Sequence, residues 1–387
     1  MGVLKFLKWL SQRHPILNRE IVETDPPKID NLYLDTNCII HNCSRKHRKD
    51  TDKKDVEDKI INHVLRCIDE LIRVVRPKNL IFISIDGVAP MAKLRGQRAL
   101  RALAVSKTHK KREESEESNL EAKSEFNRNA ITPGTEFMEK LLKELHLAIS
   151  SRINSNSSWK KCNVIISGPR VPGEGEHKII GYMREQLSQA PSLRHCIYGS
   201  DADLIILGLC THLPCVSVLR EDVQRVNGRI KRKEDVQRVN GRIKRKFIFV
   251  DLKVYRELID MEFEEVKEKI TFPYSLQNII DDWMVLTFLV GNDFIPKLSY
   301  FSVSVLPLVY RKYKSILPEL NGYITCNGVL DLNRYEKLLS VLADIPKSQK
   351  TSKGKYQQDL NVGKSMQYTK KPLAGLVDSH IESDEQK

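Results

Sequence analysis

Short apolar segments that alternate with amphipathic segments are the feature that most restricts the fold of this chain. The apolar segments lie at residues 30–35, 79–85, 162–167 and 195–199, with further short ones at 216–219 and 247–250. Residues 52–75, between the first two, repeat their apolar side chains at the helical period. Strands that alternate with helices predict an α/β fold with a mainly parallel sheet flanked by helices. Residues 275–290 and 301–345 add a helical C-terminal part.

An acidic residue follows each of the four main predicted strands. In a parallel sheet these ends lie along one edge, where ligands of such sheets bind. The turn VPGEGEH at residues 171–177 places two glutamates at the start of a helix, and a further aspartate follows an apolar helix in the segment GNDF. The complete set is Asp35, Asp86, Glu174, Glu176, Asp201, Asp203 and Asp293.

Each of these acids alone has an ordinary structural explanation. A strand-end aspartate often belongs to a turn, Asp201 and Asp203 could cap a helix or hold the metal of a nucleotide-sugar enzyme, and the helix dipole favours first-turn glutamates. Together, seven carboxylates on one rim would repel one another strongly unless cations joined them. We therefore predict a centre of two divalent ions, with Mg²⁺ as the expected ion and Mn²⁺ as its substitute. Such ions stabilise the attacking and leaving oxygens of a phosphoryl displacement, which makes the seven acids both metal ligands and catalytic residues.

A long charged segment without proline, residues 91–122, predicts a helix that starts at this edge of the sheet and protrudes from the globule. Lys93, Gln97 and Arg101 are spaced four residues apart and therefore share one face of that helix. With Arg98 they are expected to hold a second phosphate of the substrate. The mixed charges in the second half of the segment are typical of a solvated surface helix.

The net charge of +14 favours a polyanionic partner, such as nucleic acid or an acidic membrane surface. Part of this charge comes from a duplication, because residues 221–233 recur unchanged at 234–246 and the two copies supply +6. The Asn-Gly pair in each copy predicts an expanded surface loop or hairpin between the last two strands. The remaining charge is still basic but less diagnostic.

Other signals restrict the location of the protein. No apolar run reaches about 18 residues, so no transmembrane helix is expected. The 8 cysteines include no C-x-x-C pair, and the pairs Cys38/Cys43 and Cys210/Cys215 lack nearby metal-type partners in the sequence. The expectation is reduced thiols in a cytoplasmic protein, with a nuclear location as the alternative. Residues 346–387 carry few large apolar side chains and are expected to be a disordered polar tail.

The chain carries no alternative catalytic motif, since the P-loop, the G-x-S-x-G elbow and the H-E-x-x-H zinc motif do not occur in it. His177 is expected to be a packed or surface residue of the helix that follows the glutamates. His41 lies just beyond the first acidic strand end, where its ring could stack on a nucleic-acid base. A purely structural histidine is the alternative at that position.

These motifs together resemble the eukaryotic 5′→3′ exoribonuclease (XRN) family. The matching segments are DNLYLDTNCIIHNC, SIDGVAP, NAITPGTEFM, VPGEGEHKI, HCIYGSDADLIILGL and GNDFIP, in family order within residues 1–340. The resemblance implies a PIN-like nuclease domain, related to flap endonucleases, over residues 1–345. It also implies Mg²⁺-dependent, processive release of nucleoside monophosphates from single-stranded RNA with a 5′-monophosphate, and a part in RNA decay with protein partners.

The resemblance also implies roles for single residues. The seven acids would be the metal ligands or their close support. Lys93, Gln97 and Arg101 would grip the 5′-phosphate, and His41 would stack on the terminal base. The segment HNC and Glu136 in TPGTEF are more similar to the cytoplasmic branch of the family.

Two departures from the family pattern bear on activity. The family normally has arginines where this chain has Met91 and Leu100, and a leucine cannot donate a hydrogen bond to phosphate. The second conserved region of the family is missing, together with the tryptophan that clamps the base, since Trp9, Trp159 and Trp283 all belong to the first region. The chain could therefore be a truncated paralogue that binds RNA with little or no turnover, or a flap-type 5′ nuclease acting on DNA.

Overall fold

The computed structural model describes most of the chain. The described residues are 3, 5–21, 26–47, 53–117, 126–186, 192–221, 223–226, 229–232, 238–239, 242–243, 246–299, 301–343 and 345. The predicted polar tail at residues 346–387 lies outside them. None of the helices in the described part of the chain combines the length and the apolar character needed to cross a membrane.

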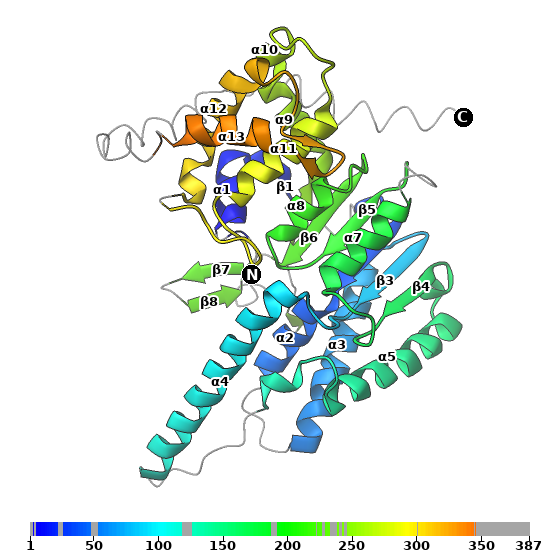
Figure 1. The fold of residues 1–387 in the computed structure, drawn as a ribbon. Helices are drawn as coiled ribbons and strands as arrows, with labels where there is room; N and C mark the ends of the chain where they lie inside the picture. Colours follow the sequence, from blue (N-terminus) through cyan, green and yellow to red (C-terminus); the bar gives the residue numbers. More distant parts are fainter. Residues whose placement is uncertain are drawn as a thin grey trace.

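A seven-stranded sheet forms the centre of the molecule (Figure 1). Its strands are β1 (Asn18–Glu20), β2 (Asn31–Asp35), β3 (Leu80–Ser84), β4 (Asn163–Ser167), β5 (His195–Tyr198), β6 (Val216–Glu221) and β11 (Phe247–Asp251). The spatial order is β1-β11-β6-β5-β2-β3-β4, and the strands from β6 to β4 run parallel, which confirms the predicted sheet. The short edge strand β1 was not predicted, because its polar residues show no apolar pattern and it forms by antiparallel pairing with β11.

The strand order reverses at β2, and this reversal places the site. Strands β3 and β4 extend the sheet on one side of β2, whereas β5 and β6 extend it on the other. Connections that leave neighbouring strands in opposite directions open a crevice between their carboxyl ends. Asp35 is the last residue of β2 and Asp201 follows β5, so two of the predicted acids flank this crevice.

Helices cover both faces of the sheet. The side chains of β2 show the division, because Leu32 and Leu34 belong to one apolar cluster and Tyr33 belongs to the other. The apolar residues of α3 that the periodicity predicted belong to the first cluster or pack against it. This cluster is covered by α2 (Thr36–Lys46), α3 (Lys53–Val75), α5 (Glu136–Ser155) and α6 (Ser157–Lys160).

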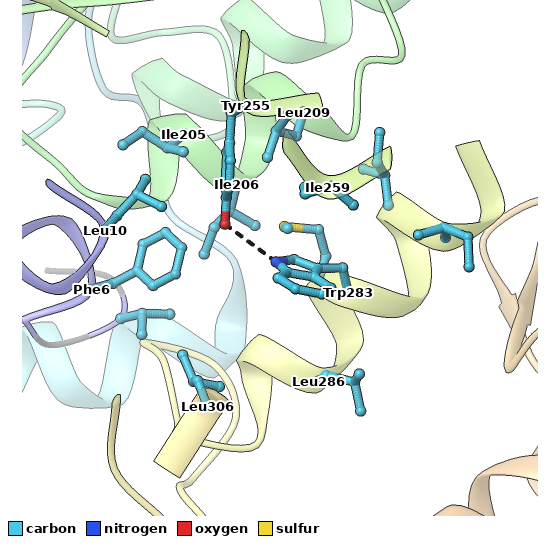
Figure 2. Close-up of a cluster of buried hydrophobic side chains, with 14 of the residues drawn as sticks. Phe6, Leu10, Ile205, Ile206, Leu209, Tyr255, Ile259, Trp283, Leu286 and Leu306 are labelled. Atoms are coloured by element: carbon cyan, nitrogen blue, oxygen red, sulfur yellow. Dashed lines mark hydrogen bonds between the residues drawn. The ribbon is translucent and has the colours of Figure 1, made fainter. Parts of the chain in front are cut away.

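The second and larger cluster joins the N-terminal helix to the C-terminal helices. Its helices are α1 (Phe6–Arg13), α7 (Gly175–Gln186), α8 (Asp203–Leu209), α9 (Leu252–Glu262), α10 (Glu264–Lys267), α11 (Leu276–Phe288), α12 (Leu306–Ile316) and α13 (Leu332–Leu342). Phe6 of α1 points into the same cluster as Trp283 of α11 (Figure 2). The Trp283 indole donates a hydrogen bond of 3.2 Å to the Tyr255 hydroxyl, and its ring stacks on Tyr310. Trp283 is therefore a core residue.

The charged segment forms α4 (Met91–Glu117), a helix that projects away from the rest of the molecule (Figure 1). The prediction of a protruding helix is confirmed as far as Glu117, and residues 118–122 lie outside the described part. Apolar side chains of α4 such as Leu103, which is 57% exposed, agree with a helix that leaves the core.

Within each copy of the duplicated segment, the described residues pair as two antiparallel strands between β6 and β11, where the sequence predicts an expanded loop or hairpin. The pairs are β7 (Val223–Val226) with β8 (Arg229–Arg232), and β9 (Arg238–Val239) with β10 (Arg242–Ile243). The register is the same in both copies, because Val226 pairs with Arg229 and Val239 with Arg242. In the sequence of each copy, the two paired segments are separated by Asn-Gly, a dipeptide preferred in short hairpin loops.

Candidate active site at the carboxyl ends of the parallel strands

Four carboxylates meet at the crevice between β2 and β5, and we call them the inner group: Asp35, Asp86, Glu176 and Asp201. Burial and the neighbouring charges of Asp86 and Asp201 raise the pKa of Asp35 to about 8. Burial and the charges of Asp35 and Asp201 likewise raise the pKa of Glu176 to about 9. Four of the predicted acids, from four segments of the sequence, are therefore electrostatic neighbours.

Gly175 lets the glutamate turn approach the aspartates. A Cβ atom at this position would lie 3.2 Å from Asp86 Oδ1 and 3.4 Å from Asp35 Oδ1. The Gly175 amide donates a hydrogen bond of 2.7 Å to Asp86 Oδ1, and the Ser84 hydroxyl donates one of 2.9 Å to the Gly175 carbonyl. The start of α7 is thus tied to the end of β3, which holds both glutamates of the turn beside the aspartates.

The inner group has the donor chemistry of a divalent metal site. Its ligands are hard carboxylate oxygens, and the two most enclosed residues, Asp35 and Glu176, are each only 7% exposed. Buried like charges at this proximity need a proton or a cation to offset them, which is why their pKa values are raised. Carboxylate oxygens of Glu174 and Glu176 also lie within 4.8 Å of each other. The acids present therefore fit the predicted metal centre.

The stability of the metal-free protein should fall as the pH rises. Carboxyl groups of the unfolded chain titrate near about pH 4, whereas the folded chain gives Asp35 a pKa of about 8 and Glu176 a pKa of about 9. The folded state keeps protons that the unfolded state has released, so the stability is full below about pH 4 and declines toward pH 8 to 9. In chelator, we expect the unfolding free energy to fall by on the order of 1 kcal/mol per pH unit for each group.

Urea unfolding in chelator at a series of pH values measures this decline. Adding Mg²⁺ should stabilise the protein more above pH 8 than below pH 6, because the ion replaces the protons. If the unfolding free energy of the protein in chelator does not change between pH 6 and pH 8, the assignment of the metal centre is contradicted.

Two further acids, Asp203 and Asp293, form an outer group beside the inner one. The backbone amide of Val3 donates a hydrogen bond of 2.9 Å to Asp203 Oδ1, which ties the start of the chain to the site. Burial raises the pKa of Asp203 against this hydrogen bond, and the charges of Asp293 and Asp201 add to the shift. Each of the seven predicted acids thus has another of the seven as a neighbour.

Lys93 of α4 is bonded to two of these acids. Its ammonium lies 2.8 Å from Glu174 Oε1 and 2.9 Å from Asp293 Oδ2. Burial opposes its charged form, but the hydrogen bonds to both carboxylates raise the pKa of Lys93. The Phe294 ring adds a cation–π contact at 5.6 Å. The ammonium therefore stays charged and offsets part of the acidic charge, a role that the sequence did not indicate for this residue.

The predicted face of α4 continues beyond Lys93. Gln97 Nε2 donates a hydrogen bond of 3.5 Å to Glu174 Oε1, and the Arg101 guanidinium donates one of 3.4 Å to Gln97 Oε1. Arg98 is exposed and lies outside this row, because adjacent helical residues point about 100° apart. The structure therefore unites three of the four predicted phosphate-binding residues.

Met91 and Leu100 of α4 occupy the positions that depart from the family pattern. Their side chains are 82% and 51% exposed. Their presence in place of arginine therefore removes positive charge from the surface of α4 and leaves the packing of the core unaffected.

The two histidines near the acids differ in their surroundings. His41 of α2 is half-buried, and burial together with the charges of two nearby arginines lowers its pKa to about 4. Its ring is therefore uncharged at neutral pH, which suits stacking on a base. His177 Nδ1 lies 3.8 and 3.9 Å from the two glutamates of the turn. The His177 side chain is 39% exposed, within the expectation of a packed or surface residue, but it lies closer to the acids than the sequence indicated.

Two polar residues that hold the site together were not predicted. Asn37 Oδ1 accepts a hydrogen bond of 3.1 Å from the Asp86 amide, which fixes the end of β3 beside α2. Lys178 Nζ donates to the carbonyls of Ile85 at 2.6 Å and Gly168 at 2.9 Å, and burial lowers its pKa to about 8. Both residues lie in recognisable motif segments, DTNC and GEHK, beside the acids.

Comparison with known proteins identifies relatives of the chain. A family model described as the XRN 5'-3' exonuclease N-terminus matches residues 1–222, and one described as the Xrn1 helical domain matches residues 273–379. The 5'-3' exoribonuclease 1 of Homo sapiens is 42% identical over 351 residues, which are 89% of this chain and 20% of the human protein. Its namesake from Saccharomyces cerevisiae is 38% identical over 89% of this chain and 22% of the yeast protein. The chain thus spans about a fifth of the length of these relatives.

Among solved structures, the catalytic core of Rad2 in complex with DNA substrate is similar over 93% of this chain and 78% of the Rad2 chain, with 15% sequence identity and a TM-score of 0.43.

The helical-domain match begins at residue 273, just before α11. The family models therefore separate the C-terminal helices from the part that contains the sheet.

Proposed function

The chain belongs to the XRN 5'-3' exonuclease family, and from this membership we propose that it hydrolyses single-stranded RNA from the 5′ end. The observation that carries the proposal is the crevice, where the acids of the sheet edge meet the basic face of α4. The proposed products are nucleoside monophosphates. The proposed setting is RNA turnover in the cytoplasm, where decay proteins would be the partners.

Magnesium is the ion we propose for the acids, with Mn²⁺ as a substitute. The inner group, Glu174 and the outer group would hold it, and it would supply positive charge for the attacking and leaving oxygens at the phosphorus atom of the scissile phosphodiester. The chain itself contributes fixed positions for the acids. The hydrogen bonds of Gly175 and Lys178 hold the glutamate turn against β3, so the carboxylates need little rearrangement during the reaction.

The face of α4 formed by Lys93, Gln97 and Arg101 would bind the 5′-phosphate of the RNA. Gln97 and Arg101 offer hydrogen-bond donors beside the acids, and Arg98 offers a further charge on the exposed side. Lys93, bonded to two carboxylates, would both position them and present its charge to the phosphate. The uncharged ring of His41 would stack on the terminal base.

Incubation of RNA with a labelled 5′-monophosphate tests this proposal. In Mg²⁺ the chain should release labelled mononucleotide, release should stop in chelator, and RNA with a 5′-hydroxyl should be a poorer substrate. RNA binding without release would instead support a binding module, which is the second candidate. Preferential cleavage of DNA flaps would support the flap-nuclease alternative.

Replacement of Arg101 by alanine should lower kcat/KM for 5′-monophosphorylated RNA by about 10–100-fold, because a hydrogen bond to a charged group contributes about 1.5–3 kcal/mol. The rate on 5′-hydroxyl RNA should change much less. Arg95, exposed on the same helix, gives the matched control Arg95→Ala, which should leave both rates near the wild-type values. If kcat/KM falls equally on both RNAs, Arg101 does not bind the 5′-phosphate.

A further inference from the structure

Away from the acidic crevice, two cysteines and two histidines gather between α2 and α3. Cys43 and His47 extend from the C-terminal end of α2, while His63 and Cys67 lie on α3. The members of each pair are four positions apart, and residues at this spacing lie on the same face of a helix. Both cysteines are only 2% exposed, and both histidines are half-buried. The cysteine spacing in the sequence did not indicate these partners, because His63 and Cys67 come to Cys43 from the next helix.

Two distances within this group match those of a tetrahedral metal site. The sulfur atoms of Cys43 and Cys67 are 3.7 Å apart, and His47 Nε2 is 3.2 Å from His63 Nδ1. Zinc bonds of about 2.3 Å to sulfur and about 2.0–2.1 Å to nitrogen, at tetrahedral angles, separate two sulfurs by about 3.8 Å and two nitrogens by about 3.3 Å. Ligand atoms of Cys43, His63 and Cys67 all lie within 4.8 Å of one another. Three of the four side chains thus already surround one position, and the His47 ring lies beside the His63 ring.

We propose that Cys43, His63 and Cys67, with His47 as the fourth ligand, bind a structural zinc ion. Two thiolates and two imidazoles make a closed donor set that leaves no open position for catalysis. Thiolate and imidazole ligands select zinc, whereas the carboxylates of the crevice suit magnesium. The two sites therefore take different metals, and this proposal is independent of the nuclease activity.

Zinc at this position would brace the helix that carries part of the crevice. Helix α2 starts directly after Asp35 and contains Asn37 and His41 before it reaches Cys43. The ion would cross-link the far end of α2 to the middle of α3. Because metal binding in such sites contributes directly to folding, removal of zinc should lower the unfolding midpoint.

Metal analysis of the whole chain, purified without chelator from zinc-supplemented cells, tests the proposal. Inductively coupled plasma mass spectrometry should find one zinc ion per chain. Cys67→Ser should lose most of this zinc, whereas Cys162→Ser, at a buried cysteine outside the group, should retain it. His47→Ala should weaken zinc affinity by about 10–100-fold, the range seen even for residues that only support a metal ligand. Asp35→Asn should retain zinc, because the crevice acids do not bind it.

A measurement on the unaltered chain keeps the test valid if the cysteine variants do not fold. Exchange of zinc for Co²⁺ should give a thiolate-to-metal charge-transfer band and the visible bands of tetrahedral cobalt. Wild-type protein that holds neither ion after refolding in its presence would overturn the proposal. Zinc that persists in folded Cys67→Ser would also overturn it, as would a mass spectrum showing a disulfide between Cys43 and Cys67.

Discussion

Replacement of Asp35 by asparagine is expected to lower the rate of Mg²⁺-dependent RNA degradation by about 10³-fold or more. Asp35 is central to the inner group, since it lies near Asp86 and Asp201 and raises the pKa of Glu176. Its charge helps to hold metal ions whose contribution to phosphoryl displacement amounts to several kcal/mol, and about 4 kcal/mol corresponds to 10³-fold. Single-turnover hydrolysis of 5′-monophosphorylated RNA measures the loss.

The stability of Asp35→Asn shows whether a loss of activity comes from the chemistry or from unfolding. Asparagine is close to aspartate in shape and carries no charge at any pH. Above pH 8, where Asp35 would ionise beside its acidic neighbours, the variant in chelator should therefore be at least as stable as the wild type. Asp251 provides the matched control, because it also ends a strand and precedes a helix, where its Oδ1 accepts a hydrogen bond of 2.9 Å from the Lys253 amide. Asp251→Asn should keep its activity, since asparagine also caps helices well. Wild-type activity in Asp35→Asn would contradict the assignment of the site.

Replacement of Asp282 by alanine is expected to lower the free energy of unfolding by about 3–5 kcal/mol. This side chain of α11 is fully buried, and it accepts hydrogen bonds from the backbone amides of Ile324 at 2.8 Å and Thr325 at 2.7 Å. The hydroxyls of Thr325 and Tyr313 also donate to it. Alanine would leave all four donors without an acceptor inside the core. Urea denaturation should show the loss as a lower midpoint with an unchanged m-value.

The adjacent residue, Asp281, gives the matched control for this prediction. Its side chain is 19% exposed and pairs with His212 Nε2 at 3.0 Å, so it reaches solvent, and within the described part of the chain it holds no backbone amide. Asp281→Ala should therefore cost clearly less than Asp282→Ala. Where Asp282→Ala remains folded at low temperature, its rate of RNA hydrolysis should equal that of the wild type, because Asp282 lies outside the crevice. Equal destabilisation by the two substitutions would show that the buried hydrogen bonds do not hold α11 in place.

Local patterns in the sequence are sufficient to predict most elements of this fold. The helix α3 and the strands β2, β3, β4 and β5 are visible because burial on one or both faces sets the spacing of apolar side chains. The strand β1 is the exception, since its three polar residues become a strand only when β11 offers an edge to pair with. A strand that depends on its partner in this way leaves no period in its own sequence.

The sequence is sufficient to predict at which edge of the sheet the candidate site lies. A parallel sheet gathers the carboxyl ends of its strands, so acids that follow strands must share one rim even when they are far apart in the chain. The side-chain partners of each acid could not be predicted in this way. The contact of Lys93 with Glu174 and Asp293 depends on how α4 leaves the sheet, and spacing along α4 indicated only that Lys93 shares a face with Gln97 and Arg101.

By itself, the sequence determined the mainly parallel sheet, the acidic edge, the projecting charged helix and the family. Only the tertiary structure decided that Asp35 and Glu176 are enclosed enough to favour protons, that Asp282 holds the C-terminal helices, and that Cys43 faces Cys67. The physical reason is the same in each case. Period and composition report which side of an element is buried, whereas these properties arise from a few atoms brought within about 3–4 Å by the packing of separate elements, and no local pattern encodes that distance.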